Sequence, residues 1–408
     1  MTLGSRHARL WLGLAVGLVW FALLLFPLLG ITPDGLTLQA TWEVLKSVVL
    51  AGVAIVGLVS LSHLPAAGGI RRAVGAAQAG TTAAAARVPG VVWAVLMLAA
   101  LVAYPQLVGR YGVDVAVNVL VYVCLGLGLN VVVGLCGLLD LGYIAFYGVG
   151  AYTYAILATQ FGVSFWVCLP IAAVLAAVAG ACIGYPTLRM RGDYLAIVTL
   201  GFGEIIRIVI NNWMSLTNGP NGIISIPPPG FYALVFDGGV SLEHILLRKL
   251  DQMYYVVLVL AVITVIAVRR LNFSRIGRAW EAIREDETAA ELMGVNTFRF
   301  KLLAYAMGAV FGGLAGAFFA ARMKSVAPNS FSFIESALVL AMVVLGGLGS
   351  IPGIVLGALA LIALPEVFRE FEQYRMLVFG GAMAVMMLVR PQGLIPATRM
   401  GKRGEDDA

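Results

Sequence analysis

The most densely charged stretch of the sequence, residues 269–301, carries the residue types best suited to binding a partner. It holds seven basic and five acidic residues, 12 of the 48 formal charges in the chain. A segment this charged is excluded from lipid, and an excess of Arg and Lys is typical of a cytoplasmic loop. Thr288 and Glu291 fit a capping box, and Gly294 can end the helix that they begin. The stretch therefore predicts a short helix lying on the membrane surface.

Apolar residues lie among these charges and would let such a helix dock into a groove on a partner. They are Trp280, Ile283, Ala290, Leu292 and Met293. The alternative is a solvated loop that only satisfies the excess of basic residues on the cytoplasmic side. The loop by itself leaves both interpretations open.

An acidic residue, Asp140, lies in apolar surroundings, between GLCGLL and LGYIAFYGVG, where Gly134, Gly137 and Gly142 are expected to interrupt a helix. An acid in a membrane span is costly and usually marks a solute path, a partner or a water-filled cavity. The alternative is that Asp140 lies at the inner headgroup level and caps the next helix.

A second carboxylate, Glu204, follows Asp193 by 11 residues. That spacing is about 16 Å along a helix, which is near the middle of a membrane. Gly201 and Gly203 are expected to break the helix there, and Arg207 lies at the right spacing to neutralise the carboxylate. A polar gate or substrate contact and a purely structural ion pair both remain open.

Nothing in the sequence is typical of an enzyme active site. The three histidines are scattered, and neither a phosphate-binding loop nor a nucleophile beside a base can be found. The four cysteines lie in apolar runs and lack the paired spacing of a zinc site. We expect no catalytic residue, no metal and no cofactor, so a partner or an ion gradient must supply the energy for any transport. The net charge of +6 comes from basic residues that flank apolar runs, which argues against nucleic acid as a binding partner.

Composition predicts an all-α polytopic membrane protein, surrounded by lipid. Hydrophobic residues make up 61% and charged residues 12% of the chain, whereas about a quarter of the residues are charged in soluble domains. Apolar runs of roughly 20 residues predict about ten or eleven transmembrane helices, some of them Gly-interrupted or re-entrant. The expected spans cover about 10–31, 44–64, 91–108, 113–134, 143–159, 163–188, 192–213, 253–268, 300–321, 336–345 with a short span that follows GGLGSIPG and ends at 364, and 376–389. Small residues in the run 300–321 would let helices approach closely.

The expected spans divide the chain into four parts. Residues 1–64 form a two-span N-terminal extension, 65–90 a cytoplasmic Ala/Gly-rich linker, 91–396 the main transmembrane domain and 397–408 a cytoplasmic tail. Basic residues beside the spans orient both termini toward the cytoplasm. Residues 215–251 form the largest outer segment, and their Gly/Pro clusters predict turns. The sequences GLCGLLDLG and GGLGSIPG interrupt spans at corresponding places in the two halves of the main transmembrane domain. Paired interruptions of this kind indicate a central solute path.

Six ordered motifs carry a resemblance to a known family. They are LGLNVVVGLCGLLDLGYIAFYGVGAY at 127–152, RGDYLAIVTLGFGEIIRI at 191–208, GPNGI at 219–223, GRAWEAIREDETAAELMGVN at 277–296, VLGGLGS at 344–350 and RPQGLIP at 390–396. Together these motifs closely resemble the permease family of bacterial ABC importers, in its LivM-type group for branched-chain amino acids. The likeness covers about residues 91–396.

The resemblance implies a permease for Leu, Ile and Val in the bacterial inner membrane. It also implies a second permease subunit, two cytoplasmic ATP-binding subunits and a periplasmic solute-binding protein. The importer loop pattern is only partly met, because Glu287 lies one position early and the I-x-L-P part is absent. Asp140 stands where relatives usually carry an uncharged residue, which leaves a substrate role for it in question.

Two sets of candidate site residues follow. The candidate substrate-path residues are Asn130, Asp140, Tyr143, Thr199 and Glu204. The candidate residues for coupling to the ATPase are Arg278, Glu287, Ala289, Ala290, Glu291, Leu292 and Gly294. The alternative functions are a permease for another amino acid or a sugar, and an ion-coupled secondary transporter in which Asp140 and Glu204 would couple to the ion.

Overall fold

The computed structural model describes residues 99, 101–190, 192–236, 240–247, 249–363 and 393–395. The expected N-terminal extension (1–64), linker (65–90), last span (376–389) and tail (397–408) lie outside the described residues. The helices and strands below belong to the unit that contains Tyr104–Glu372.

Long apolar helices form most of the described chain, which confirms the helical membrane class expected from composition. Among the described residues, six helices are long and apolar enough to cross a membrane. They are Arg110–Leu135, Phe165–Thr187, Tyr194–Asn212, Leu250–Asn272, Thr297–Met323 and Pro328–Gly346. Helices suit this setting because each backbone polar group in hydrocarbon must find its partner within the protein. The chain is a multi-pass membrane protein.

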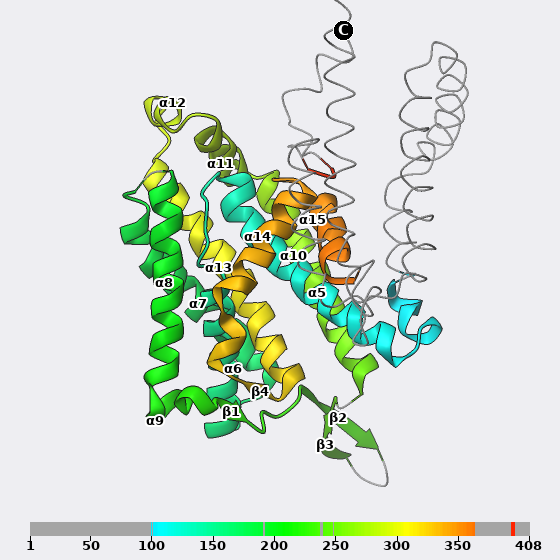
Figure 1. Cartoon of the computed structure of the whole chain (residues 1–408). Coiled ribbons are helices and arrows are strands. Elements are labelled where there is room, and N and C mark those ends of the chain that lie inside the picture. The colour runs from blue at the N-terminus through cyan, green and yellow to red at the C-terminus, as the bar shows by residue number, and fades with distance from the viewer. Residues whose placement is uncertain are drawn as a thin grey trace, which may run out of the picture. The chain divides into compact units, whose positions relative to one another are not determined.

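The helices surround a central element, α13 (Thr297–Met323) (Figure 1). It packs most extensively against α6, α7 and α5. The other described helices of the bundle are α5 (Arg110–Asn130), α6 (Ile144–Gln160), α7 (Phe165–Thr187), α8 (Asp193–Asn212), α10 (Leu250–Asn272), α14 (Phe333–Gly346) and α15 (Ile351–Ala358). Two π-helical segments, η1 (Val131–Leu135) and η4 (Leu359–Ala363), extend α5 and α15.

Small residues let α13 approach its neighbours closely, as the Gly-rich run predicted. A Cβ atom placed on Gly150 of α6 would lie 2.1 Å from the carbonyl oxygen of Gly313. One placed on Gly316 would lie 2.0 Å from the carbonyl oxygen of Tyr147. Only glycine fits at these positions, because backbone meets backbone there.

Short elements occupy the two ends of the bundle. Figure 1 shows α11 (Arg275–Glu285) and α12 (Glu287–Leu292) at one end and the short strands with α9 (Met214–Thr217) at the other. The expected turn-rich segment 215–251 holds turns, and it also contains strands that its sequence did not predict. Strand β1 (Ile223–Ile224) pairs with β4 (Ser325–Val326), and β2 (Gly230–Phe236) pairs with β3 (Val240–Leu246), both antiparallel. Short 3₁₀ turns, η2 (Gly219–Asn221) and η3 (Pro328–Phe331), complete these connections.

The expected helix break at Gly201 and Gly203 is wrong. Helix α8 runs unbroken from Asp193 to Asn212. Glycine inside a helix costs only about 1 kcal/mol relative to alanine, so packing can override it. Here Gly203 lies against Gly142, with a built Cβ 3.0 Å from the Gly142 Cα.

We predict that Gly316→Ala destabilises the bundle. The added methyl group would meet the Tyr147 carbonyl at 2.0 Å, and overpacking of this kind costs about 1–3 kcal/mol. Gly109→Ala is the control, because nothing lies within 4 Å of its built Cβ. Thermal melting of the purified protein in detergent should show a lower Tm for Gly316→Ala alone; equal melting of both variants would contradict the close approach.

Candidate translocation and coupling site

The helix break between α5 and α6 is the centre of the candidate site. Helix α5 passes into the π-helix η1, and residues 136–143 then leave regular helix before α6 begins at Ile144. Gly137 has a φ of 77°, which only glycine adopts readily. A π-helix and an open segment both leave backbone groups without their usual i→i−4 partners. Those groups must be satisfied from elsewhere in the fold.

Side chains supply three of the missing acceptors at this break. The Leu141 amide donates to Thr199 Oγ1 of α8 at 3.1 Å, and the Gly142 amide donates to Asp140 Oδ1 at 2.8 Å. The Ile144 amide donates to Ser336 Oγ of α14 at 3.0 Å. Two helices distant in sequence therefore complete the start of α6.

The second glycine-rich interruption lies against the first. Helix α14 ends at Gly346 and α15 begins at Ile351, and Gly347 and Gly349 between them have φ values of 115° and 86°. The Gly349 amide donates to Asn130 Oδ1 at 2.8 Å. The two stretches that the sequence marked as corresponding interruptions are thus brought together in space.

Four of the five candidate path residues line this break and are buried: Asn130, Asp140, Tyr143 and Thr199. The Tyr143 hydroxyl donates to the Gly308 carbonyl of α13 at 3.0 Å. In the described part of the chain, Asn130 Nδ2 and Asp140 Oδ2 are buried without a hydrogen-bond partner. Donor and acceptor capacity therefore remains at the break, of the kind that a polar solute uses.

The expectation that Asp140 caps the next helix is wrong in detail. The N-cap of α6 is Tyr143, and no side chain caps it. Asp140 instead closes the turn just before the helix by accepting from Gly142. Its carboxyl group is enclosed by protein rather than exposed at a surface.

Glu204 lies apart from the buried break. Its Oε2 accepts from Arg207 Nε at 2.7 Å, and the two side chains remain 32% and 31% exposed. The expected neutralisation of Glu204 by Arg207 is confirmed. Both side chains are half-buried, whereas Thr199 on the same helix is buried and meets Leu141.

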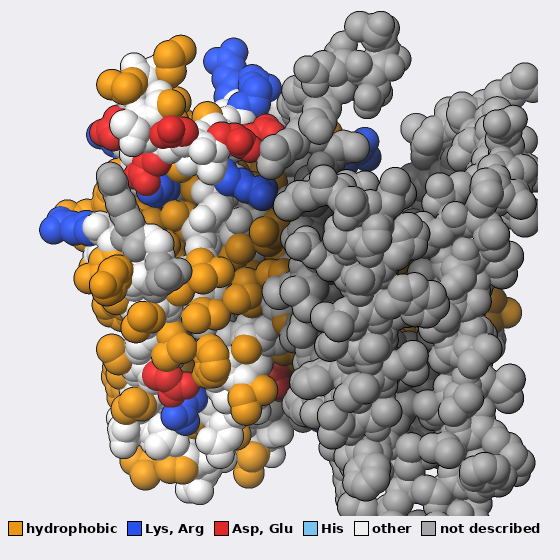
Figure 2. Space-filling model, turned by 45° about the horizontal axis from the view of Figure 1, so that its top comes forward, with side chains coloured by type: hydrophobic (Ala, Val, Ile, Leu, Met, Phe, Trp, Pro, Cys, Tyr) orange, Lys and Arg blue, Asp and Glu red, His pale blue; other side chains and the backbone are white. Residues whose placement is uncertain are grey.

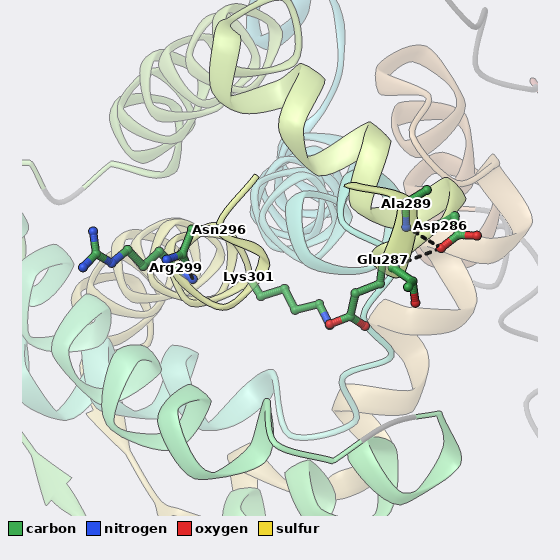
Figure 3. A network of polar contacts seen from close by, with 7 residues as sticks. Asp286, Glu287, Ala289, Asn296, Arg299 and Lys301 are labelled. Carbon is green, nitrogen blue, oxygen red and sulfur yellow. Dashed lines mark hydrogen bonds and ion pairs between the residues drawn. The ribbon is translucent and has the colours of Figure 1, made fainter. Parts of the chain in front are cut away.

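At one end of the bundle, the charged loop folds into two helices in place of the single expected one. Ser274 caps α11 by accepting from the Ile276 and Gly277 amides. Asp286 caps α12 by accepting from the Thr288 and Ala289 amides at 2.8 and 3.0 Å (Figure 3). The capping box expected at Thr288 is wrong, because the extended backbone at Asp286 starts the helix two residues earlier. The left-handed Gly294, with φ 85°, is confirmed after the end of α12.

Three contacts fasten these helices to the membrane spans. The buried Trp280 donates its indole N–H to the Phe300 carbonyl of α13 at 2.7 Å. The largely buried Lys301 of α13 pairs with Glu287 of α12 at 2.5 Å (Figure 3). The Arg284 guanidinium donates to the Gly134 carbonyl in η1. Because the acceptor of Arg284 lies in the broken helix, the charged loop is tied directly to the break.

Arg284 was not singled out from the sequence. It is one of several arginines in a charged segment, and its partner is a backbone carbonyl 150 positions away. No residue type marks such an acceptor in the sequence. The only sequence signal for this contact was the expected helix interruption, because a helix break leaves a carbonyl free to accept a hydrogen bond.

The exposed apolar surface of the loop is smaller than its sequence suggested. Trp280, Ile283 and Ala290 are buried within the chain, so they are not free to meet a partner. Leu292 and Met293 are 83% and 85% exposed at the end of α12. Figure 2 shows hydrophobic side chains at this end of the molecule beside acidic and basic groups. Arg278, Ala289 and Glu291 are exposed on the same two helices.

These features define a class of protein: a multi-pass helical membrane protein with a broken-helix polar centre tied to an exposed, charged pair of surface helices. The model of the family described as the permease component of branched-chain amino acid transport systems matches residues 112–389. The match covers more than half of the chain, so the chain belongs to this family.

Curated relatives agree with the family assignment. The chain is 49% identical over 317 residues, 75% of each chain, to the high-affinity branched-chain amino acid transport system permease protein LivM of Escherichia coli K12. It is 49% identical over 315 residues, 74% of each chain, to LivM of Salmonella typhimurium LT2. It is 26% identical over 288 residues to the permease protein LivH of Escherichia coli K12, covering 67% of this chain and 91% of LivH. No solved structure matches the chain significantly.

We predict that Arg284→Gln loosens the connection between α11 and η1. The variant loses a charge-assisted hydrogen bond, worth about 1.5–3 kcal/mol. Hydrogen–deuterium exchange should speed up about tenfold or more in residues 131–142. Arg278→Gln, an exposed arginine on the same helix, is the matched control and should leave that exchange unchanged. Unchanged exchange in both variants would show that the Arg284 contact does not hold η1.

Proposed function

We propose that the chain is the transmembrane permease subunit of an ATP-driven importer that carries Leu, Ile and Val across the bacterial inner membrane. The observation that carries this proposal is the pair α11–α12, which presents Leu292 and Met293 outward while Arg284 fastens its other side to the broken helix. Family membership and the printed functions of LivM and LivH support the substrate class.

The proposed assembly has three kinds of partner. A second permease subunit forms a heterodimer with this chain, two ATP-binding subunits dock on the cytoplasmic side, and a periplasmic solute-binding protein delivers the substrate. The chain itself contributes no ATPase. The basic residues of 269–301 support a cytoplasmic position for α11 and α12, and with it cytoplasmic termini.

The proposed arrangement of the whole chain follows the sequence. The described spans together with those expected outside them give about ten or eleven transmembrane helices. Residues 1–64 are the two-span extension, 65–90 the cytoplasmic linker, 91–396 the permease domain and 397–408 the cytoplasmic tail.

In this proposal α11 and α12 are the coupling helices. Leu292 and Met293 enter a groove on the ATP-binding subunit, and Arg278, Ala289 and Glu291 form the rim that sets orientation. Glu287, through Lys301, and Ala290, through burial, hold α12 against the permease. Gly294 allows the sharp exit from α12. Movement of the ATP-binding subunit then reaches η1 through Arg284, because packed elements move as rigid bodies.

We propose further that Asn130, Asp140, Tyr143 and Thr199 form a closed polar gate at the break. Each makes a hydrogen bond with the backbone of an interrupted segment or of a neighbouring helix. Because η1 lies between Asn130 and the segment 136–143, its displacement would shift the residues that make these bonds and open the gate.

Reconstitution of the chain with the partner subunits tests the function. Leucine, isoleucine and valine, presented with the solute-binding protein, should stimulate ATP hydrolysis and accumulate in proteoliposomes. Stimulation by sugars alone would contradict the substrate class. Uptake driven by a proton or sodium gradient without ATP-binding subunits would instead identify an ion-coupled secondary transporter.

We predict that Leu292→Asp combined with Met293→Asp separates the permease from its ATP-binding subunits. Burying one such apolar side chain is worth about 1.5–3 kcal/mol, so the affinity should fall about tenfold or more. Leu292→Ile with Met293→Leu preserves the apolar surface and is the control. Co-purification and leucine-stimulated ATPase activity measure the effect. Normal coupling in the Asp variant, at normal protein levels, would eliminate this docking role.

A further inference from the structure

Glu335, in the first turn of α14, is a carboxylate deep within the bundle. Its Oε2 accepts a hydrogen bond from the Tyr122 hydroxyl of α5 at 2.6 Å. Tyr122 lies near the midpoint of the apolar span 110–135. The residue after Glu335 is Ser336, which accepts from the Ile144 amide at the start of α6. Glu335 therefore lies at the depth of the break, away from the ends of the span.

Glu335 has no cation beside it in the described part of the chain. None of the ion pairs there includes it, and its partner Tyr122 is a neutral hydroxyl. Glu204 and Asp114, by contrast, each have an arginine partner. An acidic side chain at this depth is costly and usually marks the path of a charged solute. Glu335 is half-buried, so its carboxylate offers a place for a cationic group.

An arginine approaches the same face of α5. Asp114, Asn118 and Tyr122 are spaced by four, so they lie along one face of the helix. Arg322 of α13 donates to Asn118, and it donates to Asp114 at 2.7 Å. The Arg322 side chain is 11% exposed, whereas that of Asp114 is 50% exposed. A largely buried guanidinium is thus held about one helical turn, or roughly 6 Å along α5, from the residue that meets Glu335.

Aromatic rings lie beside these two opposite charges. The Tyr147 hydroxyl of α6 lies within electrostatic range of both Arg322 and Glu335. The Tyr147 ring packs against Phe319 and Phe331, with centroids 5.2 and 5.5 Å apart. Binding sites for small molecules typically combine an apolar wall with a few polar groups that fix orientation. A cation, an anion and an apolar wall therefore come together between α5, α6, α13 and α14.

We propose that this cluster binds the carried amino acid, with Glu335 on its ammonium group and Arg322 on its carboxylate. The rings of Tyr147, Phe319 and Phe331 contact the aliphatic side chain. The inference rests on the proposed function, because it names a site for the solute of that importer. An α-amino acid carries its two opposite charges close together and an aliphatic group beside them, which is the chemistry that the cluster complements.

The contacts seen in the structure are those of the empty site. The Tyr122 hydroxyl occupies Glu335, while Asp114 and Asn118 occupy Arg322, and the solute exchanges with these groups. Arg322 lies in the last turn of α13, at the end away from α11 and α12 (Figure 1). The site is therefore reached from the side opposite the coupling helices, before the gate at the break.

Two substitutions separate ammonium binding from a structural hydrogen bond. Glu335→Gln removes the charge but keeps an oxygen that can accept from Tyr122. Tyr122→Phe removes the hydrogen bond but keeps the carboxylate. If the carboxylate binds the solute, Glu335→Gln is the more damaging change. If the bond only holds α5 to α14, Tyr122→Phe is the more damaging one.

Leucine uptake and ATP hydrolysis are measured together in proteoliposomes that contain each variant with the partner subunits. We expect Glu335→Gln to lower the maximal uptake rate at least tenfold, because a charge-assisted hydrogen bond to the solute is lost. ATP hydrolysis should fall less than twofold, since α11 and α12 are unchanged. Tyr122→Phe should keep uptake within threefold, and Glu335→Asp, which keeps the charge, should recover most of it. Arg322→Gln should lower uptake as Glu335→Gln does.

Four results would overturn the inference. They are normal uptake in Glu335→Gln, a larger loss in Tyr122→Phe, a lower Tm or loss of the second permease in Glu335→Gln, and a need for sodium or a proton gradient that Glu335→Gln abolishes. The third would show that a protein cation pairs with Glu335, and the fourth that an inorganic cation does. Normal uptake in Glu335→Gln leaves the proposed function standing, whereas failure of uptake in the unmodified complex rejects the function itself.

A photoreactive diazirine analogue of leucine locates the solute independently. It is loaded on the solute-binding protein and illuminated while the complex hydrolyses ATP, and mass spectrometry then identifies the labelled peptides. We expect adducts on peptides that contain Phe319 or Phe331, at least fivefold fewer in Glu335→Gln, and competition by excess leucine. Adducts confined to residues 130–143, or a labelled solute-binding protein with no adduct on this chain, would contradict the site.

Discussion

The need to satisfy backbone hydrogen bonds inside the membrane governs the structure around the break between α5 and α6. A continuous helix meets this need by itself, whereas the π-helix η1 and the open segment 136–143 do not. Thr199 and Asp140 accept from amides just before α6, Ser336 accepts from the first amide of α6, and Arg284 donates to a carbonyl of η1. Elements from four parts of the chain meet here because the backbone requires them.

This dependence makes the break both specific and movable. A helix interior has one stable hydrogen-bond pattern, but side-chain acceptors on separate helices can be exchanged when those helices shift. The break is also where the surface helices reach the spans, through Arg284, while Trp280 and Lys301 hold the same helices to the start of α13. A displacement of α11 therefore acts on backbone groups that have no partner in their own helix.

Close packing around α13 gives this arrangement its rigidity. Gly150 and Gly316 bring α6 and α13 into backbone contact, and such contacts leave little room for independent movement.

Ion pairs contribute to the arrangement in a different way. Burying charges is expensive, so Lys301–Glu287 fixes which groups meet more than it adds to stability. The bundle is closely packed around α13 and interrupted between α5 and α6.

Composition alone decided the membrane class, because transfer of apolar residues from water to lipid depends only on residue type. Local pattern decided the left-handed Gly294 and the two glycine-rich interruptions, since positive φ is a property of single residues. The tertiary structure decided which groups meet. It buried Trp280, moved the cap to Asp286, kept α8 continuous through its glycines and gave Arg284 a carbonyl partner. These outcomes depend on contacts between residues far apart in the chain, and hydrogen-bond partners of that kind leave no local mark in the sequence.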